Sequence, residues 1–381
     1  MDTIGILGKE ALELLRGMVA IPSVSFHEAG VCSYISEVLS GRGISHHLEK
    51  NNIVALCRHF SPEKKTLMLN AHTDTVPGNG EYSFDPYKPD YGKVREIFGK
   101  GKDEIVCGLG SNDDGGSVVS LCAAFQYFYE KDLPFNIVLV LSCEEERSGP
   151  DGMTWIWEHY NDIPGLGYAR KPDWAIIGEP TGMKAATSER GLLVLDGEAE
   201  GVSGHAARGE GVNALYIALD DIAALRGHRF RKISPVMGEV RLSVTQIEAG
   251  TAHNVIPDKC RFTVDIRPTE MYDNREILEE LQGICRSRLT ARNLRNRSSA
   301  TSPDSALLHC IGKLGIETYS SPTTSDWLRV GCDAVKMGPG ESSRSHKKDE
   351  YILAEEITGG INTYISFIGT LAEYIKTTFI K

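Results

Sequence analysis

Residues 66–77 read TLMLNAHTDTVP, and the predicted fold is organised around this stretch. The apolar run 67–69 predicts a short buried strand, and His72 and Asp74 follow at its carboxyl end. In a twisted parallel sheet, ligands gather outside the carboxyl ends of the strands. A histidine and an aspartate there can hold a metal, with the aspartate orienting the imidazole. A histidine with a purely structural role would give the same pattern. The residues at the other strand ends are therefore needed to distinguish a metal ligand from a structural residue.

Length and composition limit the class of protein. A chain of 381 residues is too long for one ordinary core, so two domains are expected. No apolar run approaches a membrane span and no leader pattern opens the chain, which predicts a cytoplasmic protein without a membrane partner. Nine scattered cysteines without a CxxC pair fit free thiols. The net charge of −11 argues against a nucleic-acid partner.

Two further apolar runs end in acidic residues. Residues 137–141, IVLVL, lead to the three glutamates at 144–146, and residues 174–177, WAII, lead to Glu179. Three acids in a row are usually a solvated patch. At the end of a buried strand, however, neighbouring side chains point to different sides, so one carboxylate can bind a metal while the next acts as a base.

A glycine-rich turn, GLGSNDDGG at 108–116, precedes a predicted helix over 117–129. A phosphate loop is disfavoured, because there is no Gly-Lys-Ser/Thr and two aspartates would repel a phosphate. Asp113 could instead bridge cations, and Asp114 could be an ordinary helix N-cap. The segment 78–102 has no clear period and is expected to be a long surface excursion.

The pattern of predicted elements indicates an α/β protein with a smaller inserted domain. Helices are expected before and after the strand runs and at the end of the chain. Between 182 and 296 the order is strand, helix, two strands and a helix, with room for a last strand, which suggests a split βαβ unit. The predicted domains are therefore 1–181 with 297–381, carrying a mostly parallel sheet, and an inserted domain at 182–296.

The residues at or after the strand ends form one set. They are His72, Asp113, Glu145, Glu146, Glu179 and His346. Two histidines and several carboxylates suit zinc or a similar divalent ion, and no cysteine is among them. One acid must stay free of metal to act as a base. The count fits a two-metal centre in which Asp113 is the bridge.

Five motifs carry a resemblance over nearly the whole chain. They are HTD at 72, GLGSNDDGG at 108, EEE at 144, GEPT at 178 and HKKDEY at 346. In this order they resemble the metallopeptidase family of acetylornithine deacetylase, succinyl-diaminopimelate desuccinylase and carboxypeptidase G. The resemblance implies a zinc-peptidase-like catalytic domain with two Zn²⁺ per subunit, for which Co²⁺ or Mn²⁺ may substitute. It also implies a ferredoxin-like lid that often forms a homodimer.

The resemblance also implies a role for each matching residue. One metal is expected on His72, Asp113 and Glu179, and the other on Asp113, Glu146 and His346. Asp74 matches the aspartate behind the first histidine, and Glu145 matches the catalytic base. Two departures stand beside these matches. Glu144 replaces an aspartate, and Asp114-Gly115 replaces the usual Met-Lys.

In the lid, His205 matches a histidine that reaches into a neighbouring subunit's site to polarise the scissile carbonyl. Asn254 and Arg267 match lid positions that meet the substrate or its carboxylate. A surface-loop histidine, a turn asparagine and an exposed arginine remain alternatives. Thr324 and Ser325 belong to a TSD resembling that of the desuccinylases. Gly340 is expected to shape the substrate pocket.

The expected reaction is hydrolysis of an N-acyl amino acid, most simply an acyl-ornithine in arginine biosynthesis. Succinyl-diaminopimelate is an alternative substrate, and a dipeptidase or carboxypeptidase is the nearest rival enzyme. A non-catalytic binding protein on the same scaffold is disfavoured, because every expected position is filled.

Overall fold

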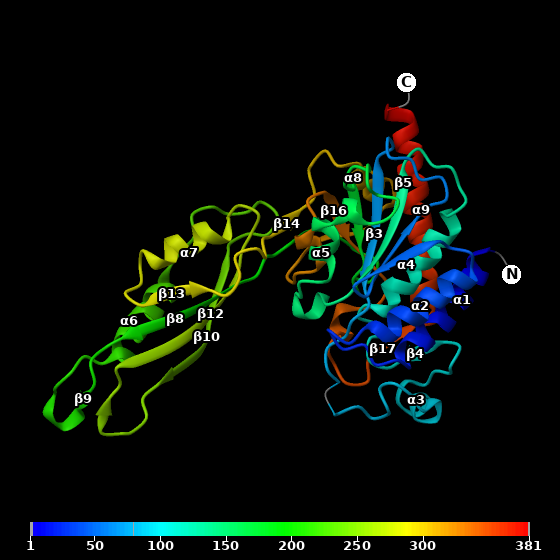
Figure 1. Cartoon of the computed structure of the whole chain (residues 1–381). Coiled ribbons are helices and arrows are strands. Elements are labelled where there is room, and N and C mark those ends of the chain that lie inside the picture. Colours follow the sequence, from blue (N-terminus) through cyan, green and yellow to red (C-terminus); the bar gives the residue numbers. More distant parts are fainter. Residues whose placement is uncertain (1–2, 79, 380–381) are drawn as a thin grey trace. The chain divides into compact units, whose positions relative to one another are not determined.

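The computed structural model describes residues 3–78 and 80–379, which divide into two compact units (Figure 1). The larger unit comprises Met1–Thr187, Thr301–Tyr319 and Ser325–Lys381, and the inserted unit comprises Ser188–Ala300 and Ser320–Thr324. The insertion predicted at 182–296 and the inserted unit share residues 188–296.

The larger unit is built on a mixed sheet, and its central strands are parallel. The strand order is β1 (His46–Glu49), β2 (Asn52–Leu56), β5 (Asn136–Ser142), β3 (Thr66–His72), β6 (Trp174–Ile177), β16 (Asp333–Lys336) and β7 (Ala185–Glu189). β3 runs parallel to β5 and β6, and β6 runs parallel to β16. Short strands β14 (Ser299–Ala300) and β15 (Thr318–Ser321) pair with β7. The predicted α/β fold with a mostly parallel central sheet is confirmed.

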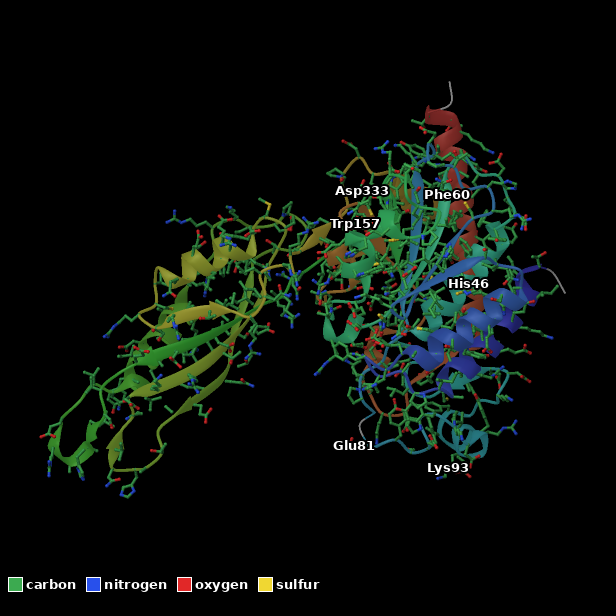
Figure 2. All side chains as sticks on the ribbon, in the orientation of Figure 1. His46, Phe60, Glu81, Lys93, Trp157 and Asp333 are labelled. Carbon is green, nitrogen blue, oxygen red and sulfur yellow. The ribbon has the colours of Figure 1, made fainter. Side chains whose placement is uncertain are left out.

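Both faces of this sheet are buried, which explains the unbroken apolar runs in its strands. Leu67 and Leu69 pack with one core and Met68 with the other, since successive side chains point to opposite faces. Phe60, labelled in Figure 2, packs against both cores. The first core includes residues of helices α1 (Thr3–Val19), α2 (Ala29–Gly41), α4 (Gly115–Phe128), α8 (Ala306–Leu314) and α9 (Ala354–Phe379). The second includes residues of α5 (Met153–Glu158) and the short helix η2 (Tyr160–Asp162).

The segment predicted as an aperiodic excursion, 78–102, contains a helix, α3 (Tyr91–Phe98). Asp90 caps its first turn by accepting a hydrogen bond from Gly92, and Gly99 ends it in the left-handed conformation. The helix has eight residues and Val94 is its buried residue, so its sequence has no run of buried apolar positions that would reveal a helix. It packs beside β4 (Ile105–Cys107), which pairs with β17 (Tyr351–Leu353). The predicted surface excursion therefore contains a helix that the sequence analysis did not anticipate, and most residues of that helix are exposed.

The inserted unit is an antiparallel sheet with two helices. The strand order is β10 (Arg241–Ala249), β12 (Lys259–Arg267), β8 (Leu193–Glu200) and β13 (Arg288–Ala291). Helix α6 (Ala214–Gly227) follows β8 and helix α7 (Asn274–Gln282) follows β12, and both contribute to the core of the unit. A short ladder joins β9 (Gly204–His205) to β11 (Val255–Ile256). This βαββαβ order with its strand arrangement is the expected ferredoxin-like fold.

None of the helices within residues 3–78 and 80–379 combines the length and apolar character needed to cross a bilayer.

Candidate metal centre

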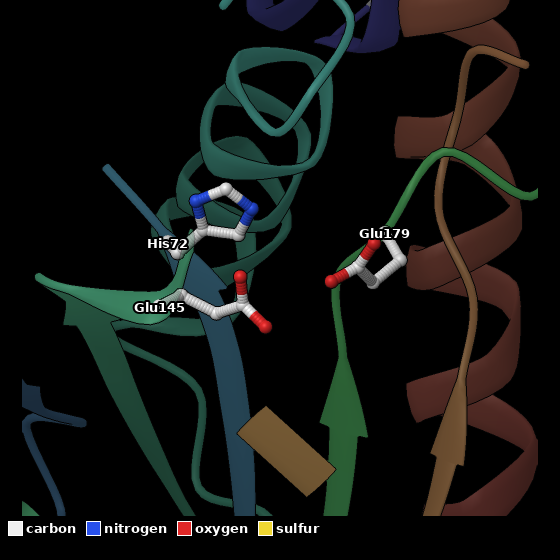
Figure 3. A group of neighbouring side chains, drawn as sticks. All are labelled: His72, Glu145 and Glu179. Atoms are coloured by element: carbon white, nitrogen blue, oxygen red, sulfur yellow. The ribbon is translucent and has the colours of Figure 1, made fainter. Parts of the chain in front are cut away.

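The carboxyl ends of three neighbouring strands deliver the first residues of the site. β3 ends at His72, which pairs in register with Ser142 at the end of β5. Asn70 pairs with Ile177 at the end of β6. The turns that follow β5 and β6 carry Glu145 and Glu179, and these two side chains and His72 are neighbours in Figure 3.

Ligand atoms of the predicted residues come close enough to share cations. His72, Glu145 and Glu179 form one group and His72, Asp113 and Glu146 a second, with the ligand atoms of each group within 4.8 Å of one another. Five of the six strand-end residues therefore come together, but not in the two expected ligand sets. Glu145 takes the place of Asp113 beside Glu179, and His72 takes the place of His346 beside Glu146. Glu145, expected to be the base, thus belongs to one ligand group just as Glu146 belongs to the other.

Asp113 lies between the two histidines. Its Oδ1 is 3.2 Å from Nε2 of His72, and its Oδ2 is 3.7 Å from Nε2 of His346. His346 also lies 2.8 Å from Oε1 of Glu146, which comes from the short helix η1 (Glu145–Arg147). One carboxylate oxygen thus faces each histidine, which is the arrangement a bridging ligand needs.

Asp74 lies behind His72 and also holds the glutamate turn. Its Oδ1 is 3.3 Å from Nδ1 of His72 and accepts a hydrogen bond from the Glu145 N–H at 3.0 Å. Its Oδ2 accepts hydrogen bonds from the Glu146 N–H at 3.1 Å and from the Ser25 hydroxyl at 2.7 Å. Burial would raise the pKa of Asp74, but these donors outweigh it and lower that pKa. The carboxylate is therefore fixed as an anion.

The protonation of the site reflects a dense group of buried acids. Burial raises the pKa of Glu145 and of Glu179 well above their ordinary value, and neighbouring carboxylates raise both further. Burial lowers the pKa of His72, but Asp113 and Asp74 overcome this and raise it well above its ordinary value. Buried charges need a partner. Two imidazoles and several carboxylates whose repulsion a cation would relieve are a donor set that fits divalent metal ions.

The two departures from the family pattern have different environments. The Glu144 carboxylate accepts a hydrogen bond from the Asp151 N–H at 3.0 Å, so it braces the following loop. Asp114 occupies the N-cap position of α4, but its side chain makes no capping hydrogen bond. Burial is the main cause that raises the pKa of Asp114 to about 8.

Two of the predicted lid residues are neighbours in the inserted unit. Nδ1 of His205 accepts a hydrogen bond from the Ala207 N–H at 3.2 Å, and the Asn254 carbonyl accepts one from the Ala206 N–H at 3.0 Å. Both His205 and Asn254 are exposed. Arg267 instead forms a bidentate ion pair with Asp265, with N–O distances of 2.9 and 3.1 Å.

Two of the three remaining predicted substrate residues, Ser325 and Gly340, have structural roles of their own. Ser325 caps the short helix η4 (Asp326–Arg329) by accepting a hydrogen bond from the Trp327 N–H. Thr324 ends the short segment that clusters with the inserted unit. Gly340 has φ of +84°, and a Cβ there would lie 2.4 Å from Oδ1 of Asn112. Close packing against Asn112 thus accounts for this glycine without a substrate.

Several buried polar residues of the site have no individual role in the sequence analysis, although Asp326 lies in the TSD motif and Glu350 in HKKDEY. Asp326 accepts a hydrogen bond from the Ser142 hydroxyl at 2.5 Å, and burial is the main cause that raises its pKa to about 6. Glu350 accepts three backbone hydrogen bonds from the turn that carries Asp113. Lys336, buried at the end of β16, is the positive charge that opposes the rise in the pKa of Glu179. A lysine ending an apolar strand was the available sequence signal for Lys336.

A model of peptidase family M20/M25/M40 matches residues 68–370. The chain is 26% identical over 285 residues to succinyl-diaminopimelate desuccinylase 2 of Ruegeria sp. (strain TM1040), covering 71% of this chain and 68% of that protein. It is also 26% identical over 325 residues to acetylornithine deacetylase of Aliivibrio fischeri (strain ATCC 700601 / ES114), covering 80% of this chain and 81% of that protein.

The fold is shared with solved structures. The M20 family metallo-carboxypeptidase Sso-CP2 from Sulfolobus solfataricus superposes with a TM-score of 0.73 at 18% sequence identity, covering 98% of this chain and 100% of that one.

Proposed function

We propose that this chain, which belongs to peptidase family M20/M25/M40, is a two-metal amidohydrolase that removes an N-acyl group from an amino acid. The convergence of His72, Asp113, Glu145, Glu146, Glu179 and His346 on one edge of the sheet carries the proposal. The two curated relatives, a desuccinylase and a deacetylase, support a deacylase over a peptidase.

The proposed metal is zinc, two ions per subunit, with Co²⁺ or Mn²⁺ able to substitute. His72, Asp113 and Glu179 would hold one ion, and Asp113, Glu146 and His346 the other. When bound, such ions supply Lewis acidity that activates water and polarises an acyl oxygen. The position of Asp113 between the two histidines supports the shared role of its carboxylate.

The side chains of this chain provide the proton transfers. Glu145 takes a proton from the attacking water and returns it to the leaving amine. The raised pKa of Glu145, caused first by burial, supports this role because a more basic carboxylate accepts a proton more readily. Asp74 keeps the Glu145 and Glu146 amides in place and orients the His72 ring.

His205 is the proposed donor to the developing oxyanion. Its Nδ1 accepts the Ala207 N–H, so in the neutral ring the proton is on Nε2, the nitrogen that can donate. Asn254 and Arg267 are proposed to contact the substrate, and Arg267 would have to share its guanidinium with Asp265.

The proposed substrate is an N-acyl-ornithine in arginine biosynthesis. The test is a panel of N-acetyl and N-succinyl derivatives of ornithine, citrulline, lysine and diaminopimelate, with amine release measured before and after chelator treatment. We expect chelator-sensitive release that is fastest for an acyl-ornithine. Preference for succinyl-diaminopimelate would change the substrate, and hydrolysis of dipeptides alone would replace the deacylase with a peptidase. No release and no bound divalent ion would support a binding protein instead.

We also propose a homodimer formed through the inserted unit, in a reducing cytoplasmic setting. β10 is an end strand of its sheet, and its outward side chains are largely exposed, which supports a surface available to a second copy. All nine cysteines are free, which supports the reducing setting. Light scattering after size exclusion tests the dimer, and a monomer mass at micromolar concentration would reject it.

A further inference from the structure

We propose that Glu350 is a positioning residue that fixes Asp113 and ties the Asp113 turn to the loop carrying His346. The inference rests on the metal centre of the proposed function. It starts from a buried carboxylate that lies in none of the ligand groups.

The hydrogen bonds that the Glu350 carboxylate accepts come from the glycine-rich turn. Oε1 accepts hydrogen bonds from the Asn112 N–H at 2.8 Å and from the Asp113 N–H at 2.9 Å. Oε2 accepts one from the Gly110 N–H at 3.1 Å. The Glu350 carbonyl accepts a fourth, from the Gly108 N–H at 2.9 Å. One residue thus takes up four N–H groups of a turn more than 230 positions earlier in the chain.

These contacts fix the backbone of Asp113 itself. By accepting the Asp113 N–H, Glu350 restrains the backbone from which the Asp113 carboxylate faces His72 and His346. Glu350 is 2% exposed, so water does not compete for these hydrogen bonds. In its ionised form the Glu350 carboxylate also makes stronger hydrogen bonds than a neutral acceptor would.

His346 lies four positions before Glu350 in the chain. The Asn112 side chain reinforces the link, because its Oδ1 accepts the Glu341 N–H at 2.9 Å and its Nδ2 donates to the Glu341 carbonyl at 3.1 Å. The loop with His346 is therefore attached to the Asp113 turn at both ends, by Asn112 before the histidine and by Glu350 after it. Together, these two attachments set the separation of the two candidate ligands, Asp113 and His346.

We expect replacement of Glu350 to weaken metal binding and to leave the protein folded. Residues that orient metal ligands from behind typically change metal affinity by about 10–100-fold when replaced. We expect Glu350→Ala and Glu350→Gln to weaken binding of the second Zn²⁺ equivalent by about this factor. The Gln variant keeps one acceptor oxygen and should lose less. Zn²⁺ affinity is measured on chelator-treated full-length protein by competition with a chromophoric chelator.

Asp221 provides a matched control. It is also a buried carboxylate that accepts two successive backbone N–H groups, from Arg286 at 2.9 Å and Ser287 at 2.7 Å, but it belongs to the inserted unit. Asp221→Asn should lower the melting temperature and leave both Zn²⁺ affinities unchanged. If the Glu350 variants lower only the melting temperature, as Asp221→Asn does, Glu350 is a structural residue and the inference is wrong.

Amide hydrogen exchange in wild-type protein without metal gives a second test that needs no variant to fold. The N–H groups of Gly110, Asn112 and Asp113 should be protected, because their acceptor belongs to the chain and not to the metal. Exchange of these amides at the rate of an open loop would overturn the inference. If wild type binds no divalent ion but these amides are protected, the proposed function is wrong, whereas the role of Glu350 in holding the turn is supported.

Discussion

Asp74 and Glu350 are buried carboxylates that each accept backbone N–H groups from a turn carrying candidate ligands. Backbone N–H groups beyond the end of a strand or before the first turn of a helix have no partner within that element. Asp74 takes up those of Glu145 and Glu146 after β5, and Glu350 takes up those of Asn112 and Asp113 before α4. Each buried carboxylate therefore satisfies and restrains backbone N–H groups of a turn that carries candidate ligands.

The assignment of Glu145 as base and Glu146 as ligand is tested by one matched pair of variants. We expect Glu145→Gln to keep two metal ions per chain and to lose about 10²–10⁴-fold in turnover, because it cannot accept a proton. Glu146→Gln should instead lose metal. Metal content by mass spectrometry and turnover are measured on the same preparations.

The opposite result is informative because Glu145 lies within 4.8 Å of ligand atoms of His72 and Glu179. If Glu145→Gln loses a metal ion while Glu146→Gln keeps both, the two roles are exchanged.

At the scale of elements, the site depends on how closely β6 approaches β3 and α4. The Gly178 N–H donates to the Asn70 carbonyl at 2.6 Å. A Cβ on Gly178 would lie 2.6 Å from Cβ of Ser117 and 3.1 Å from Cβ of Ala71. Only a glycine fits there, one position before Glu179.

Gly178→Ala should therefore displace Glu179 and weaken metal binding, and it should destabilise the fold by about 1–3 kcal/mol through overpacking. Gly369→Ala is the control, since Gly369 lies within α9 and its added Cβ meets nothing within 4 Å. That variant should gain about 0.5–1 kcal/mol of helix stability. Urea unfolding and Zn²⁺ titration distinguish the two. Equal metal affinity in Gly178→Ala and wild type would contradict the packing argument.

At the scale of the whole molecule, the acidic centre makes stability depend on pH in an unusual direction. Burial is the main cause that raises the pKa of Asp326 to about 6 and of Glu350 to about 7. The Glu146 hydrogen bond raises the pKa of His346 to about 8. In each case the folded chain binds the proton more tightly than the unfolded chain does, so protonation stabilises the fold. The contribution of each group to folding stability is present at low pH and is lost as the pH rises through the pKa of that group in the folded protein.

We expect the melting temperature of chelator-treated protein to fall between about pH 4 and pH 8. Asp74 and Asp113, whose pKa values are lowered, act in the opposite direction, but only below about pH 4. Zn²⁺ should raise the melting temperature more at pH 8 than at pH 5, because ligands must lose their protons to bind metal. Differential scanning fluorimetry at both pH values measures this. A metal-free protein that becomes more stable from pH 5 to pH 8 would refute the prediction.

The strand ends could be predicted because their signals are local. The apolar runs at 67–69, 137–141 and 174–177 identify buried strands, and the polar residues that follow lie at a common edge once the strands are parallel. Helix α3 was missed because Val94 is its buried residue and gives no period. The orientation of Arg267 toward Asp265 was missed because nothing local indicates which charge a guanidinium meets.

The sequence by itself therefore determined the class of fold, the set of candidate ligands and the family resemblance, since each rests on runs and motifs of a few residues. Only the tertiary structure decided how those ligands are held. Ser25 meets Asp74 across 49 positions, Ser142 meets Asp326 across 184, and Asp113 meets Glu350 across 237. Hydrogen bonds between such distant residues leave no periodic or local trace in one chain, because folding alone brings their partners together.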